Sequence, residues 1–130
     1  MIAVLALLAV CLAALWLMLV GLLCAAAPGQ ALHFLSRMGS SWTINLAELV
    51  PRGLIGLAMV IHAPASKAPD EFTVFGWFLA ISAAAILVVP RARHHAFAAG
   101  AAAGIPEWTV RWLVRPISLG AGFLMAWSAL

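Results

Sequence analysis

The sequence predicts an all-α integral membrane protein with four transmembrane helices, and three observations lead to this prediction. Of the 130 residues, 66% are hydrophobic and only 8% are charged, whereas a soluble domain carries about 25% charged residues. A chain of this length leaves much of its surface in solvent, so this amount of apolar surface requires lipid around it. Four apolar stretches are each long enough to cross a bilayer, which takes about 17–25 residues. We therefore expect a single transmembrane domain over residues 1–130.

The first apolar stretch, residues 1–27, is predicted to be the first transmembrane helix. It contains no charged residue before Pro28. A secretory signal peptide is the rival interpretation, but the stretch has no basic n-region and is longer than a typical apolar h-region. Small side chains recur along it and offer a face for close helix contact; they are Ala3, Ala6, Ala9 and Ala13.

The second transmembrane helix is predicted over residues 43–63. Before it lies a connection, in which residues 31–38 are expected to form a short helix at the membrane interface. A helix over 43–63 spans about 30 Å, which matches the hydrocarbon core. A start at Pro51 would leave only about 20 Å. We therefore expect Pro51 to lie inside the helix and to bend it.

The third transmembrane helix is predicted over residues 72–89. The loop PASKAP precedes it, and Asp70 and Glu71 suit the positive end of its dipole. The long connection that follows, residues 91–106, has an apolar part that is too short to cross the membrane. We place that part at the interface.

The fourth transmembrane helix is predicted over residues 108–130. It carries the clearest signature for helix contact in the chain, a small residue at every fourth position: Ser118, Gly122 and Ala126.

The distribution of basic residues predicts the orientation of these helices. With both termini outside, six arginines lie at cytoplasmic helix ends and only Lys67 lies in the outer loop, as the positive-inside rule requires. Those arginines are Arg37, Arg52, Arg91, Arg93, Arg111 and Arg115. We expect a multi-pass protein of the bacterial inner membrane with periplasmic termini. His94 and His95 are interpreted as part of a basic strip that faces the lipid headgroups.

The second helix is the one apolar stretch with strong charges in its body. Its polar and sulfur-containing residues lie on one side of the helix, with Ile55 in the gap: Asn45, Glu48, Arg52, Met59 and His62. Glu48 and Arg52 have the spacing and order of a helical ion pair, and Asn45 can add a hydrogen bond. This group is an internal pair that fixes helix register, part of a proton or ion relay, or a polar anchor for a partner. Because helices one and three offer only Ser82 as a facing polar group, we favour the internal pair.

His62 and Met59 belong to residue types that ligate haem iron, and His also ligates chlorophyll magnesium. A doubly ligated haem needs a partner from another helix at similar depth, and no other predicted helix contains a His. We therefore expect His62 to cap its helix at the interface beside an ordinary core Met59. No metal site is predicted at His94 and His95, which have no Cys, Asp or Glu near them.

Sequence signatures of catalysis are missing, because there is no nucleophile with a nearby base, no HExxH, no phosphate loop and no pair of catalytic carboxylates. No basic run with interleaved aromatics predicts nucleic-acid binding. We expect a non-catalytic accessory subunit of a larger membrane complex, such as a respiratory or photosynthetic one. Its partners would be the lipid bilayer and other membrane subunits. The alternatives are a protein that binds a lipid, quinone or tetrapyrrole cofactor through His62, and a small transporter or proton channel that uses Glu48 and Arg52.

The last part of the chain has a recognisable layout. An apolar helix ends in VVPRARHH, a short linker follows, and IPEWTVR opens a final apolar helix, with Arg111 five places after Pro106. This layout resembles the YjeT-like family of small uncharacterised bacterial inner-membrane proteins. The resemblance covers residues 75–130; Pro90 and Pro106 are spaced more widely than in that pattern. It implies a membrane protein of unassigned role and no known chemistry.

Overall fold

The computed structural model describes all residues from 1 to 130, which form helices and no strand. The elements follow in this order: α1 (Ile2–Ala26), α2 (Pro28–Ser36), α3 (Trp42–His62), the 3-10 turn η1 (Ala63–Ala65), α4 (Pro69–Val88), α5 (Arg91–Gly104), α6 (Glu107–Thr109), the π-helical segment η2 (Val110–Val114) and α7 (Arg115–Ala129). Three helices are long and apolar enough to cross a membrane: Ile2–Ala26, Trp42–Ala65 and Pro69–Val88. The predicted all-helical fold with membrane-length helices is confirmed to this extent.

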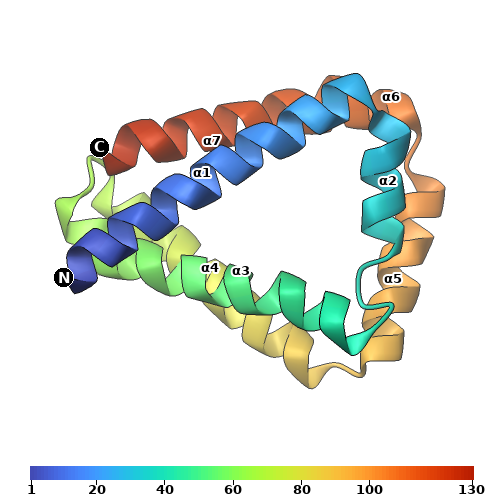
Figure 1. The fold of residues 1–130 in the computed structure, drawn as a ribbon, viewed down its shortest axis with the longest axis horizontal. Helices are drawn as coiled ribbons and strands as arrows, with labels where there is room; N and C mark the ends of the chain where they lie inside the picture. The colour runs from blue at the N-terminus through green and yellow to red at the C-terminus, as the bar shows by residue number, and fades with distance from the viewer.

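The helices form three sides of a triangle (Figure 1). α1 and α7 pack as one antiparallel pair, and α3 and α4 pack as a second. These two long pairs meet at the end that holds both termini and η1, and they diverge towards the other end. There the short helices α2 and α5 pack together and close the triangle. The two ends of the molecule are therefore built in different ways.

The apolar core lies at the end where the two long pairs meet. Its buried members come from α1, α3, η1, α4 and α7: Ala6, Val10, Ala58, Met59, Ala63, Phe72 and Ala129. Only 23 of the 130 residues are buried, so the chain covers little of its own apolar surface. Large apolar side chains stand exposed along every long helix, as expected for helices surrounded by lipid.

α3 and α4 cross where two glycines meet. A Cβ atom on Gly56 would lie 2.5 Å from the Gly76 carbonyl oxygen and 2.6 Å from the Ala80 nitrogen. These backbones approach so closely that only glycine fits at the crossing. No pattern in the sequence predicted this pair of glycines.

α1 and α7 approach each other in a similar way. A Cβ atom on Gly122 would lie 2.7 Å from the Ala14 carbonyl oxygen, and one on Gly21 would lie 2.6 Å from Leu119 Cγ. The predicted line of Ser118, Gly122 and Ala126 thus has its buried member against the first helix of the same chain. The predicted small-residue face of α1 is buried at Ala6 and Ala13 and exposed at Ala3, while Ala9 is half-buried.

The predicted helix bounds need three adjustments. α3 begins one residue early, at Trp42, and contains Pro51 as expected; Ser41 Oγ caps it by accepting from the Ile44 N–H at 3.2 Å. α4 begins at Pro69, three residues before the prediction, because a proline fits the first helical turn. The connection over 91–106 is mostly the helix α5.

The fourth predicted helix is observed as three consecutive helical segments, α6, η2 and α7, which run without a break from Glu107 to Ala129. The hydrogen-bond pattern changes from α to π in η2 and back to α in α7. In η2, the N–H of Arg115 bonds to the carbonyl of Val110, five residues back. Pro116 accounts for this change, because it has no N–H to donate and its ring crowds the carbonyl of Trp112. The α7 segment alone has 15 residues, so it is shorter than the three apolar helices above.

Candidate functional site

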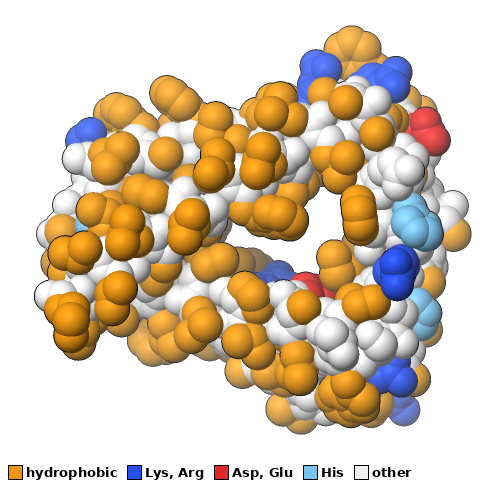
Figure 2. Space-filling model, viewed as in Figure 1, with side chains coloured by type: hydrophobic (Ala, Val, Ile, Leu, Met, Phe, Trp, Pro, Cys, Tyr) orange, Lys and Arg blue, Asp and Glu red, His pale blue; other side chains and the backbone are white.

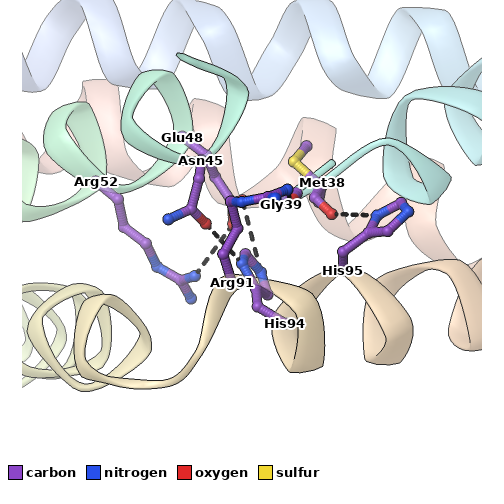
Figure 3. Close-up of polar contacts among 8 residues, drawn as sticks. All are labelled: Met38, Gly39, Asn45, Glu48, Arg52, Arg91, His94 and His95. Atoms are coloured by element: carbon purple, nitrogen blue, oxygen red, sulfur yellow. Dashed lines mark hydrogen bonds and ion pairs between the residues drawn. The ribbon is translucent and has the colours of Figure 1, made fainter. Parts of the chain in front are cut away.

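A cluster of polar side chains lies where the start of α5 meets the start of α3. We call it the polar corner and define it by six residues: Asn45, Glu48 and Arg52 of α3, and Arg91, His94 and His95 of α5. Figure 3 shows the three α5 side chains directed at the α2–α3 connection and at the first turns of α3. The first half of the predicted α3 stripe thus has a facing polar partner.

His94 lies at the centre of the polar corner. Its Nδ1 is 2.9 Å from Asn45 Oδ1, and its Nε2 is 3.7 Å from Glu48 Oε2. Because an amide oxygen only accepts hydrogen bonds, Nδ1 carries the proton of this contact. The Nε2 atom faces the Glu48 carboxylate, but 3.7 Å is longer than a hydrogen bond.

Glu48 is the least satisfied side chain of the polar corner. Its Oε1 is 3.9 Å from Arg52 Nη1, which is long for an ion pair. Its Oε2 is buried and accepts no hydrogen bond. The predicted pair of Glu48 and Arg52 therefore exists but is loose, with side chains 21% and 31% exposed. A carboxylate in this state has free capacity to accept a proton or a donor from a bound molecule.

Arg91 and His95 fasten α5 to the α2–α3 connection. Arg91 Nη1 donates to the carbonyl oxygens of Gly39 at 2.8 Å and Ser40 at 2.7 Å, and His95 Nδ1 donates to the Met38 carbonyl at 3.0 Å (Figure 3). Gly39 has a φ of 69°, and a Cβ atom there would lie 3.0 Å from the His95 nitrogen. Glycine is required at this position by both its conformation and the close approach of α5.

The sequence pattern places His94 and His95 in a strip that faces the headgroups, and this stays a prediction. In the structure both side chains make contacts within the chain: His94 contacts Asn45 of α3, and His95, like Arg91, bonds to the α2–α3 connection. Four of the arginines that were predicted to lie at the cytoplasmic interface differ in how exposed their side chains are. Arg37, Arg93 and Arg111 are exposed, while Arg115 is half-buried and stacks over the Trp112 ring at 5.3 Å.

A groove of about 450 Å³ adjoins the polar corner. Its charged wall consists of Glu48, Arg52, Arg93 and His94, from α3 and α5. Its apolar wall comes from α2, from the end of α4, from α5 and from the α2–α3 connection: Leu35, Met38, Ile86, Val89, Phe97, Ala98 and Ala101. The groove therefore places charged groups beside a surface that suits hydrocarbon.

His62 and Met59 lie at the opposite end of α3 from the polar corner. His62 is 6% exposed, and its Nε2 donates to the Ala129 carbonyl at 2.9 Å, beside the Phe72 ring. The sequence predicted that His62 would cap its own helix. Instead, its side chain hydrogen-bonds to the backbone of α7. Met59 is buried in the core. Ligation through Nε2 would require breaking this bond, and no three His, Cys, Asp or Glu side chains gather closely enough to hold a metal.

His94 is the functional candidate that the sequence analysis missed. A usable signal was present, because the predicted topology put Asn45, Glu48 and His94 on the same side of the membrane. A buried amide and carboxylate require polar partners, and the first and third predicted helices offered only Ser82. Histidines in the neighbouring connection were the remaining source.

No protein-family model, curated protein or solved structure matches this chain. The resemblance of residues 75–130 to the YjeT-like family stays a prediction. The case for function rests on the sequence and on the geometry of the polar corner, the groove and the helix pairs.

Proposed function

We propose that this protein crosses the bacterial inner membrane four times and is a non-catalytic accessory subunit of a larger membrane complex. The fourth span would be Glu107–Ala129, about 30–35 Å long at about 1.5 Å per residue. It runs beside α1, which is itself long and apolar enough to cross. Both termini and Lys67 lie at one end of the molecule, whereas α2 and α5 lie at the other (Figure 1). This arrangement supports periplasmic termini by the positive-inside rule.

The unfilled opening between the two helix pairs carries this proposal. Figure 2 shows an opening through the molecule that is edged mainly by hydrophobic side chains. In lipid, helices gain stability from close van der Waals contact with other helices. In this chain the α1–α7 pair and the α3–α4 pair do not touch along much of their length, because α2 and α5 hold the two pairs apart at one end. A helix of another subunit in the opening would restore the missing contacts.

Site-specific photo-cross-linking in the native membrane tests this proposal. One photoreactive residue replaces Ile55, on the inner stripe between Arg52 and Met59, and a control replaces Leu54, which is 62% exposed on α3. We expect a defined protein adduct from position 55 and mainly lipid adducts from position 54, together with co-purification of that protein in mild detergent. A lone monomer that gives lipid adducts at both positions would contradict the proposal.

Proton transfer is a second candidate, because the structure supplies a polar partner that faces Glu48. A proton path through a membrane needs polar groups on more than one helix, and Glu48 with Asn45 on α3 faces His94 on α5. In proteoliposomes that contain a pH-sensitive dye, we expect E48Q and H94Q to abolish proton flux and R111Q to leave it intact. Flux of equal size in E48Q and the unmodified protein would exclude this candidate.

A further inference from the structure

We propose that the groove beside the polar corner binds an anionic phospholipid. Arg52 and Arg93 would hold the phosphate, and an acyl chain would lie along Ile86, Val89 and Phe97. This site lies within the single chain, so the inference does not depend on whether the protein belongs to a larger complex.

The groove has the size and composition of a site for an amphiphile. Its volume of about 450 Å³ lies within the range of small-molecule pockets, about 300–1,000 Å³. Two guanidinium groups and one carboxylate line the same space, so the charged wall carries a net positive charge even when His94 is neutral. Charge complementarity therefore favours an anion over a zwitterion or a cation.

The two arginines of the groove have donors to spare. Arg93 is exposed, and none of the side-chain hydrogen bonds and ion pairs of the chain involves it. Arg52 has only the loose contact with Glu48 at 3.9 Å. Arg91 on the same helix as Arg93 is different, because it is already engaged with two carbonyl oxygens. A guanidinium presents five N–H donors in a planar fork, which matches two oxygens of a phosphate.

The apolar wall points to a lipid and not to a free phosphate ion. Ile86 and Val89 come from the end of α4, a helix of membrane length, and Phe97 comes from α5. A free phosphate would leave this wall unused, whereas a phospholipid fills it with an acyl chain. The charged and apolar walls meet where a membrane-length helix ends, and basic pockets at such places bind lipid headgroups.

Native mass spectrometry of the detergent-purified full-length chain tests the site. The probes are phosphatidylglycerol and phosphatidylcholine with identical acyl chains, titrated separately. We expect phosphatidylglycerol to be retained more strongly, and R93Q to weaken its binding about fivefold, since one basic residue near a lipid surface contributes this much. R111Q is the matched control, because Arg111 is an exposed arginine outside the groove. Equal retention of both lipids, or equal weakening by R111Q, would overturn the proposal.

Two further measurements separate a lipid site from a simpler charge effect. R52Q alone leaves Glu48 without its pair, so the double variant E48Q/R52Q is compared with E48Q, from which it differs only in the charge of Arg52; we expect weaker phosphatidylglycerol binding in the double variant. If the double variant binds as tightly as E48Q, Arg52 is no part of the site and the proposal fails in this form. Inorganic phosphate is added as a competitor at millimolar concentration. We expect it to displace little lipid, and full displacement would mean that the groove is a phosphate site only.

Discussion

The two ends of α3 lie in different surroundings. At the end with the termini, Met59 and His62 are buried in a core of small and apolar side chains, where one hydrogen bond joins His62 to Ala129. At the other end, Asn45 and Glu48 each contact His94 of α5. One helix face thus stabilises the fold by apolar packing at one end and by hydrogen bonding at the other.

The two histidines that contact this face show what the difference means. His62 makes one short bond to a carbonyl oxygen, lies beside the Phe72 ring and takes part in no ion pair. His94 touches an amide and a carboxylate, and that carboxylate keeps one buried oxygen without a partner. A satisfied buried group stabilises structure, whereas an unsatisfied one marks a place where a proton or ligand can bind. The His62 end is therefore a satisfied part of the core, whereas the His94 end is where the proposed proton transfer and lipid binding would take place.

The largest effect is expected from G56A, which tests the apolar packing. The added Cβ would meet the Gly76 carbonyl and the Ala80 nitrogen, so α3 and α4 must separate. We expect a loss of about 3 kcal/mol in stability, measured by thermal unfolding in detergent. G120A is the control, since no atom lies within 4 Å of its new Cβ. It should raise stability by about 0.5–1 kcal/mol; equal losses in both variants would contradict the crossing.

The next effect is expected from H62A, which removes the single polar link of the core. The Ala129 carbonyl loses its donor inside an apolar region, at a cost of about 2 kcal/mol in the free energy of unfolding. H33A is the matched control, because His33 is exposed and its side chain makes no hydrogen bond. The same thermal unfolding assay measures both. If H33A is as unstable as H62A, the bond to α7 does not stabilise the fold.

A smaller and local effect is expected from R91A, which acts on the polar corner. Two bonds from Arg91 to the α2–α3 connection are lost, so α5 should open more often while α3 and α4 stay closed. We expect amide hydrogen exchange in residues 91–104 to become about tenfold faster. R93A alters a neighbouring arginine whose side chain makes no hydrogen bond or ion pair within the chain, and it should leave exchange unchanged. Faster exchange throughout the molecule in R91A would show that α5 does not open independently of α3 and α4.

The smallest effect is expected from K67A at the end that holds the termini. Lys67 Nζ donates to the Trp127 carbonyl at 3.1 Å on the exposed surface. Water competes for such a bond, so we expect the free energy of unfolding, measured by thermal unfolding, to change by less than about 0.5 kcal/mol. A loss comparable to that of H62A would mean that surface polar contacts, and not the apolar core, hold this end together.

Much of the helical layout could be predicted, because hydropathy and helix length depend on local sequence. α1, α3 and α4 lie within three residues of their predicted bounds, and Pro51 lies inside α3 as its length required. The periodic stripe of α3 also lies on the inner side, with Asn45 only 2% exposed. A repeat of three and four residues defines a face whatever that face later contacts.

The partners of these faces could not be predicted to the same degree. Gly56 and Gly76 look like ordinary helical glycines until two backbones are seen to cross there. The partner of Asn45 is His94, which lies 49 positions further along and on a helix that hydropathy alone assigned to a connection. The acceptor for His62 is a backbone carbonyl, which carries no residue-specific signal. Periodicity shows which side is buried but not what it is buried against.

The pairing of α1 with α7 has a consequence for how the chain is made. Everything from Ala27 to Val114 is synthesised between these two helices, whereas α3 and α4 are neighbours in sequence. The α3–α4 hairpin can close as soon as both helices enter the bilayer. α1 must wait there until α7 arrives, with its small-residue face open to other helices. Gly21 and Ala14 therefore remain uncovered by α7 until the last helix of the chain has been made.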